Sequence, residues 1–194
     1  MDTDTPSVLL VEDEPDLAEL YASWLEAGYR VETLRDETAA RERLEEGFDV
    51  VVVDRCRPDE GTELCDAIRS RELDSRTLIV TGTRPDAEPE EAAFDDYLLK
   101  PLSRDELRRS VENLLLRRTY DEQLGAYFEL VSRKAALDGQ LSEAERQSSQ
   151  EYAELEDRIA VLRTEVDETR SQLLDRGHNR RLYRDVSSVP DPSG

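Results

Sequence analysis

The sequence predicts an α/β fold with a parallel sheet, followed by a separate helical module. Between residues 7 and 118, short apolar runs alternate five times with amphipathic stretches, which is the pattern of repeated strand-helix units. One run, Val50 to Val53, has four consecutive valines, as expected for a strand that is buried on both faces of a sheet. After about Thr119 no strand-like run occurs, and apolar residues recur at helical spacing.

Each predicted strand is an apolar run that stops at polar residues. The first run is Val8 to Val11, and Pro15 suits the first turn of the helix that follows it. Pro85 and Pro89 shorten a later helix. This order implies a doubly wound, five-stranded parallel sheet with helices on both faces. The other strands are expected at 29–34, 48–54, 77–80 and 97–99, and the other helices at 36–46, 64–73, 84–94 and from Ser103 onward.

The chain therefore divides into four parts. Residues 7–118 hold the sheet, and residues 119–175 form the helical module. Residues 1–6 and 176–194 contain too few apolar side chains to fold alone, and we expect both to be flexible or disordered.

The helical module has two apolar seams that flank a polar middle. The seams run from Tyr120 to Val131 and from Tyr152 to Leu173. Gly139, followed by the capping pair Ser142 and Glu145, predicts a helical hairpin, although a continuous coiled coil fits the same pattern. The regular second seam must be buried against another surface, which favours a homodimer through residues 120–173 over an intramolecular helix pair.

Composition narrows the class of protein. The formal charge of −21 opposes contact with nucleic acid or acidic lipid, and no apolar stretch is long enough to cross a bilayer. The start MDTDTP is unlike a signal peptide, so we expect a cytoplasmic protein. Only Lys100 and Lys134 are lysines among the 26 basic residues, and this acidic, arginine-rich composition suggests a halophilic source. Cys56 and Cys65 lack disulfide or metal-site spacing, and His178 is not expected to bind metal.

Polar residues follow four strand ends, which meet at one edge of a parallel sheet. Crowded carboxylates there would collect a cation, and oxygen ligands suit Mg²⁺. Asp54 could then attack a phosphoryl group whose charge the metal and a lysine neutralise. The residues are Glu12 and Asp13 after the first strand, Asp54 at the end of the third, Thr81 after the fourth and Lys100 after the fifth.

The segments VEDE, VVVVDRCRP, VTGT and YLLKP, in this order and spacing, resemble the receiver domain of two-component response regulators. The resemblance covers residues 7 to about 118 and implies a flavodoxin-like fold with Asp54 as the phosphoacceptor for a sensor histidine kinase. Glu12 and Asp13 would be the acidic pair that holds Mg²⁺. The resemblance also implies a metal ligand in the main-chain carbonyl of Cys56, switch residues in Thr81 and Tyr97, and a catalytic Lys100 before a cis proline at Pro101.

The sequence departs from the receiver pattern at two places. The loop from Arg57 to Gly61 is one residue shorter than in the family, and the segment 84–94 carries two prolines where the family has a helix of its output face. Residues 119–175 resemble the HalX domain, which follows receivers in halophilic archaea, through RRTYDEQL and EYAELE.

The predicted function is therefore a response regulator rather than an enzyme with an external substrate, with at most self-phosphorylation and autodephosphorylation. Phosphorylation of Asp54 would be relayed to the helical module. Two alternatives stay open: an adaptor that works without phosphorylation, and an aspartyl phosphatase, which would need a second acid where Cys56 stands. DNA binding would rest only on association with receivers in general, and the charge does not support it.

Overall fold

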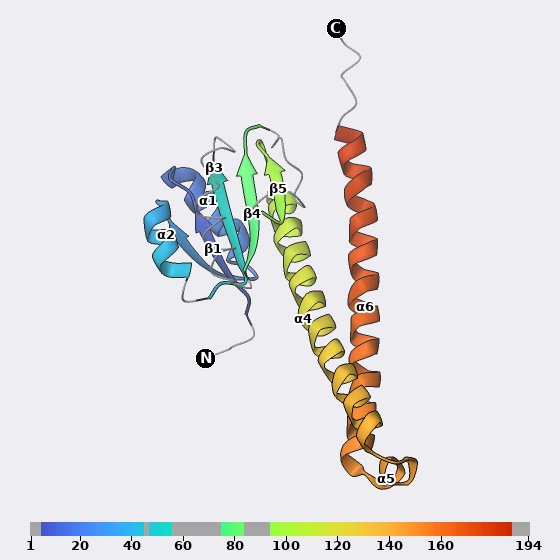
Figure 1. Cartoon of the computed structure of the whole chain (residues 1–194). Coiled ribbons are helices and arrows are strands. Elements are labelled where there is room, and N and C mark those ends of the chain that lie inside the picture. Colours follow the sequence, from blue (N-terminus) through green and yellow to red (C-terminus); the bar gives the residue numbers. More distant parts are fainter. Residues whose placement is uncertain (1–4, 45–46, 56–74, 84–93, 188–194) are drawn as a thin grey trace. The chain divides into compact units, whose positions relative to one another are not determined.

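The computed structural model of the chain describes residues 5–44, 47–55, 75–83 and 94–187 (Figure 1). Two compact units meet between Leu115 and Leu116. The first contains a five-stranded parallel sheet with flanking helices and the second is helical, which confirms the predicted fold class. The loop from Arg57 to Gly61 and the helices expected at 64–73 and 84–94 lie outside the described residues.

The sheet has the strand order β2-β1-β3-β4-β5, and all four pairings are parallel. In Figure 1 the arrows of β3, β4 and β5 point in one direction, and because all four pairings are parallel the carboxyl ends of the five strands share one edge. The chain order reverses between β1 and β3, and ligands bind open α/β sheets at such a switch point. The strands are β1 (Ser7–Val11), β2 (Arg30–Leu34), β3 (Val50–Arg55), β4 (Arg76–Thr81) and β5 (Asp96–Leu99).

The consecutive valines of β3 pack alternately on the two faces of the sheet. Val50 and Val52 pack on the face that is covered by α1 (Pro15–Leu25) and the first turns of α4 (Arg104–Gln140). Val51 and Val53 pack on the opposite face with α2 (Glu37–Arg43). All four valines are fully buried, and full burial of each such side chain contributes roughly 1.5–3 kcal/mol.

Local signals set the helix ends as the sequence predicts. Pro15 opens α1, and the Asp36 carboxylate caps α2 by accepting the Ala39 N–H at 2.8 Å. At the start of α4, Glu106 accepts both the backbone N–H and the hydroxyl of Ser103 at 2.7 Å. These caps satisfy N–H groups that have no partner within a helix.

Helix α4 runs without a break from Arg104 to Gln140 and so passes through the boundary expected near residue 118. After Gln140, a capping box formed by Ser142 and Glu145 starts the short helix α5 (Glu143–Ser148). Helix α6 (Gln150–Ser187) then follows. A helical hairpin is therefore present, with its turn where Gly139 and the capping pair predicted a break.

The two long helices of the second unit are antiparallel (Figure 1). Near one end, the Thr169 hydroxyl donates to Gln123 Oε1 at 2.8 Å, and near the turn the Tyr152 hydroxyl donates to Asp138 Oδ1 at 2.6 Å. The residue numbers of the partners on α6 therefore decrease as those on α4 increase, as in an antiparallel pair. Tyr152, Leu155 and Val166 of the second apolar seam are buried within the chain.

The chain folds back and buries part of the seam from Tyr152 to Leu173 against its own α4. The homodimer through residues 120–173 stays a prediction, because these contacts describe a single chain. The intramolecular pair satisfies the same apolar periodicity, since a heptad pattern does not state which chain supplies the partner helix.

The end of α6 also differs from expectation. Disorder was predicted from residue 176, but α6 continues to Ser187. Once a helix exists, each added residue gains a hydrogen bond without a new nucleation cost, so a segment that would not fold alone can extend it. Residues 188–194 lie outside the described part of the chain.

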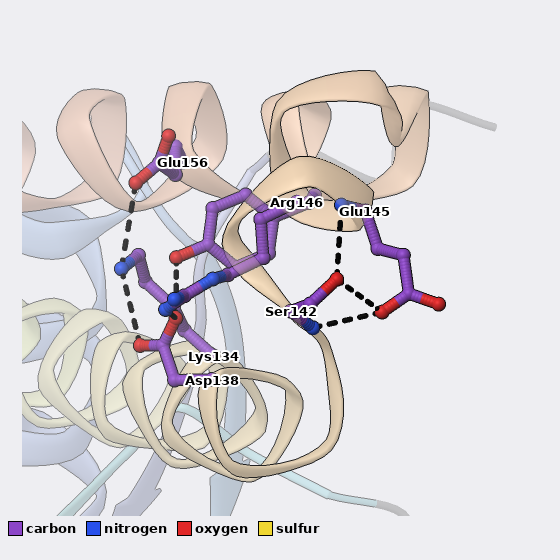
Figure 2. Close-up of polar contacts among 7 residues, drawn as sticks. Lys134, Asp138, Ser142, Glu145, Arg146 and Glu156 are labelled. Atoms are coloured by element: carbon purple, nitrogen blue, oxygen red, sulfur yellow. Dashed lines mark hydrogen bonds and ion pairs between the residues drawn. The ribbon is translucent and has the colours of Figure 1, made fainter.

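The polar middle of the predicted module forms a network near the hairpin turn (Figure 2). Asp138 accepts from Tyr152, from Arg146 at 2.9 Å and from Lys134 at 3.4 Å. The Lys134 ammonium also lies 3.4 Å from Glu156 and 5.0 Å from the centre of the Tyr152 ring. Charged residues at core positions of paired helices can fix their register, and here they join α4, α5 and α6.

The network shifts the pKa values of Asp138 and Lys134 so that their charged forms are favoured. Hydrogen bonds from Tyr152, Arg146 and Lys134 lower the pKa of Asp138 to about 2. The pKa of Lys134 is raised by its contacts with Tyr152, Glu156 and Asp138. Both groups are therefore charged across the physiological pH range.

Candidate functional site

The sheet register brings the predicted site residues to one edge. Val11 at the end of β1 is level with Val53, so Glu12 follows β1 beside Asp54. On the other side of β3, Asp54 is level with Val80 of β4. Thr81 of β4 is level with Leu99 of β5, the residue before Lys100. The carboxyl ends of β1, β3, β4 and β5 thus converge, as the sequence predicts.

Asp54 is enclosed and paired with Lys100. Its side chain is 2% exposed, and Oδ1 lies 2.7 Å from the Lys100 Nζ. Oδ2 is buried and accepts no hydrogen bond from the described residues. Burial alone would lower the pKa of Lys100, but its hydrogen bond with Asp54 and the negative charges of the site outweigh that effect and raise it.

Glu12 is the second buried carboxylate of the site. Its Oε1 accepts the Glu14 N–H at 2.9 Å, whereas its Oε2 is buried without a hydrogen-bond partner among the described residues. Burial, followed by the interaction with Asp54, raises the pKa of Glu12 to about 8. The Glu12 carboxyl is therefore harder to ionise than an ordinary glutamate, as expected beside a second buried acidic residue.

The other predicted residues lie in different environments. Asp13 is exposed. The Thr81 hydroxyl is buried and donates to the Thr83 carbonyl at 3.0 Å, so it is engaged in its own loop and not with Asp54. Tyr97 is buried against Phe94, with ring centres 6.3 Å apart. The peptide bond between Lys100 and Pro101 is cis, and Cys56 lies outside the described residues.

Tyr21 is a residue of the site that the sequence analysis missed, because it appeared only as an apolar position of the first helix. It is 3% exposed and packs in the core cluster that contains Val52, two residues before Asp54. Burial, then the charge of Asp54, raises the pKa of Tyr21 to about 12, so the phenol stays protonated. A buried tyrosine usually needs a partner for its hydroxyl, and that rule was the available signal.

The charges at this edge of the sheet suit the binding of an anionic group together with a cation. Within the described ranges, no three His, Cys, Asp or Glu side chains form a preformed metal cluster. The enclosed site instead offers one Glu12 oxygen and one Asp54 oxygen that have no hydrogen-bond partner among the described residues, beside the Lys100 ammonium. Such a site can take a cation between the carboxylates and an anionic group beside the lysine.

The fold is thus an α/β domain with a doubly wound parallel sheet, and buried acidic residues and a lysine lie at its switch-point edge, where such domains bind ligands. The chain belongs to the response regulator receiver domain family, which matches residues 8–112, and a HalX domain matches residues 116–182. The chain thus joins a receiver of two-component signalling to a HalX domain.

Curated relatives agree with this assignment. A putative transcriptional regulator of Haloferax volcanii is 36% identical over 185 residues, which cover 92% of this chain and 32% of that protein. The phosphate regulon transcriptional regulatory protein PhoB of Rhizobium meliloti is 35% identical over 58% of this chain and 53% of its own length. The chain therefore spans a third to about half of these relatives.

Solved structures show the same receiver fold. The receiver domain of a putative LuxO repressor protein from Vibrio parahaemolyticus has a TM-score of 0.56 and 26% identity, over 61% of this chain and 96% of that one. The BeF3-activated DrrB receiver domain has a TM-score of 0.51 and 27% identity, over 57% of this chain and 97% of that one. Among the described residues, no helix is both long and apolar enough for a membrane span.

Proposed function

We propose that this response regulator accepts a phosphoryl group on Asp54 from a sensor histidine kinase, with Mg²⁺ bound, and relays its state to the HalX domain. The observation that carries this proposal is the environment of Asp54. One oxygen is held by Lys100 at 2.7 Å, and the other is enclosed without a hydrogen bond from the described residues. A carboxylate so placed has a lone pair available for attack.

The transfer step follows from these two oxygens. A lone pair on Asp54 Oδ2 forms the new bond to phosphorus while the bond between phosphorus and the histidine nitrogen of the donor breaks. The departing imidazole keeps that electron pair and takes up a proton from solvent. Lys100 lies where it can neutralise charge on the transferred oxygens, and its raised pKa keeps it cationic.

The residues fit Mg²⁺ as the metal. This ion uses one or two carboxylates and keeps several waters, which matches the oxygens of Glu12 and Asp54 that no described residue hydrogen-bonds. When bound, Mg²⁺ would neutralise the developing charge on the phosphoryl oxygens. Asp13 is exposed beside the site and would complete the acidic set, and the Cys56 carbonyl remains a proposed ligand from the family resemblance.

The relay is proposed to use Thr81 and Tyr97. The Thr81 hydroxyl would leave the Thr83 carbonyl and donate to the phosphoryl group, at the cost of one hydrogen bond that the new one replaces. Tyr97 already lies inward against Phe94, so any rearrangement on phosphorylation would act through that aromatic pair.

The partners follow from the same comparisons. A 120-residue stretch of this chain is 32% identical to 12% of the sensor histidine kinase TmoS of Ectopseudomonas mendocina, which supports a partner kinase for the receiver. Several relatives are named as transcriptional regulators. A charge of −21 opposes direct contact with DNA, so we propose that the HalX domain acts on another protein.

Labelling with a small phosphodonor tests the site. Acetyl phosphate labelled with ³²P should label the full chain in Mg²⁺ and not in chelator, and Asp54→Asn should abolish labelling. Asp95→Asn is the control, since Asp95 lies outside the site and pairs with Arg76. Persistent labelling of Asp54→Asn would refute the assignment of the acceptor, and unlabelled wild-type protein would refute the proposed function.

A further inference from the structure

Lys134 and Asp138 stand at seam positions of α4 where paired helices usually carry apolar side chains. They continue the alternating spacing of the seam from Tyr120 to Val131, which reaches Leu141 beyond them. An uninterrupted apolar seam accepts any helix with the same spacing, from the same chain or from a second copy. The two charged residues are therefore the positions at which these partners differ.

The contacts of these residues with α5 and α6 need the closed turn (Figure 2). The Lys134 ammonium lies 3.4 Å from Glu156 Oε1. Asp138 accepts the Tyr152 hydroxyl at 2.6 Å and the Arg146 guanidinium at 2.9 Å. These partners follow by 22, 14 and 8 residues in the sequence. Along one continuous helix they would lie roughly 33, 21 and 12 Å away, so straightening the turn breaks the contacts.

A continuous parallel coiled coil of two copies would put like charges together. In such a pair each seam residue faces the same residue of the second copy, so Lys134 would face a lysine and Asp138 an aspartate. Like charges at facing core positions repel strongly because little water screens them. The Tyr152 hydroxyl would also lose the Asp138 carboxylate that it binds in the hairpin.

We infer that Lys134 and Asp138 determine which partner the α6 seam accepts. They select α4 of the same chain and reject a second copy in a continuous parallel coiled coil. The apolar seam residues supply the buried surface, and the charged pair supplies the choice of partner. Two closed hairpins keep all of these contacts, so the rejection concerns the continuous coiled coil and not the association of hairpins. This role is independent of phosphorylation at Asp54.

The leucine variant, Lys134→Leu with Asp138→Leu in the full chain, tests the inference. Both Cys56 and Cys65 are replaced by serine, and Val166→Cys is added as the reporter. Val166 is buried in the hairpin, but it would face itself across a parallel coiled coil, where two cysteines can join. At equal protein concentration under mild oxidation, we expect the leucine variant to form disulfide-linked dimers about 100-fold faster than the chain with the native pair.

The matched control removes another ion pair of the same spacing on α4. The Arg118 guanidinium lies 2.8 Å from Glu122 Oε1, four residues later, and the Glu122 side chain is 58% exposed. Replacing both residues by leucine adds the same two apolar side chains and leaves the net charge as the leucine variant does. Dimers linked through Val166→Cys should form at the rate of the chain with the native pair.

Tyr152→Phe is a second test variant that keeps the buried ring and removes only the hydroxyl donor to Asp138. The hairpin loses one hydrogen bond, whereas the parallel coiled coil loses none. We expect the rate of cross-linking to rise about three- to tenfold. Far-ultraviolet circular dichroism checks that each variant keeps its helix content.

The outcomes decide the inference in either direction. Faster cross-linking of the leucine variant and of Tyr152→Phe, with an unchanged control, supports it. Equal rates for the leucine variant and the native pair overturn it, and so does an equal rise in the Arg118 and Glu122 control, because added apolar surface then explains the dimers. Rapid cross-linking of the native pair also overturns it, since a second copy is then accepted. If the leucine variant loses helix content, Tyr152→Phe decides alone, and a rate equal to that of the native pair refutes the role.

Discussion

The ammonium of Lys100 lies 2.7 Å from Oδ1 of Asp54, a carboxylate whose side chain is 2% exposed. Lys100→Met removes the charge while keeping most of the side-chain length. We expect labelling of Asp54 by acetyl phosphate to slow by about 100-fold, because developing negative charge loses its fixed counter-charge. Leaving the buried carboxylate unpaired should also lower the free energy of unfolding by roughly 1–3 kcal/mol.

The other lysine provides the control for this change. Lys134 lies in the hairpin network, which belongs to the chain's other compact unit. Lys134→Met should therefore leave the labelling rate unchanged. Equal labelling rates for Lys100→Met and the wild type would contradict a catalytic role for Lys100.

In metal-free protein, ionisation of the buried Glu12 beside Asp54 should lower the free energy of unfolding. The pKa of Glu12 is raised from 4.5 to about 8, so its contribution to stability is complete below pH 4.5 and is lost as the pH rises through 8. At about pH 9 in chelator, Glu12→Gln should unfold at a higher temperature than the wild type. Added Mg²⁺ should reverse that order, since only the wild type supplies both carboxylates.

Thermal unfolding followed by far-ultraviolet circular dichroism measures this effect. Glu19→Gln, at an exposed position of α1, should behave as the wild type at every pH. A metal-free Glu12→Gln variant that shows the pH dependence of the wild type would show that Glu12 is not the titrating group.

The hairpin network predicts the opposite pH dependence at low pH. The pKa of Asp138 is lowered from 3.8 to about 2, so its stabilising contribution is present above pH 3.8 and is lost as the pH falls through 2. The wild type should be more stable than Asp138→Asn at neutral pH, and the difference should shrink below pH 3.8. Asp157→Asn, at an exposed position of α6, should match the wild type throughout the titration.

The intramolecular pairing of α4 and α6 can be tested by cross-linking. Gln123 and Thr169 share a side-chain hydrogen bond of 2.8 Å, so Gln123→Cys with Thr169→Cys should form a disulfide within one chain. Cys56 and Cys65 are first replaced by serine. Oxidised protein should run as a monomer on a non-reducing gel, and Val161→Cys, which is 60% exposed, should not pair with Gln123→Cys. Covalent dimers would show that the helices pair between chains.

Sequence patterns predicted the sheet well because each strand ends abruptly. The valine run before Asp54 indicates a buried strand, and the polar residues after Val11 indicate the carboxyl end of the first strand. The sequence could therefore predict the strand positions and the meeting of Glu12, Asp54 and Lys100 at one edge of the sheet. The family resemblance added the cis bond before Pro101, which no pattern of burial could supply.

Other features depend on pairings that the sequence does not encode locally. The seam from Tyr152 to Leu173 required a partner helix, but its spacing is the same for a partner in the same chain or in a second copy. The polar positions Lys134 and Asp138 looked like a gap in the seam, although they form its most connected part. Tyr21 was hidden by its helical spacing, because periodicity identifies a buried position without showing what its hydroxyl faces.

The scarcity of lysine has a practical consequence for chemical labelling. Apart from the α-amino group, an acylating reagent finds amines only at Lys100 and Lys134, one in each compact unit, and each is about a quarter exposed and bound to carboxylates. Peptide mass mapping after brief acylation thus gives two separate readings from one sample. Protection of Lys100 reports the acceptor edge of the sheet, and protection of Lys134 reports closure of the hairpin.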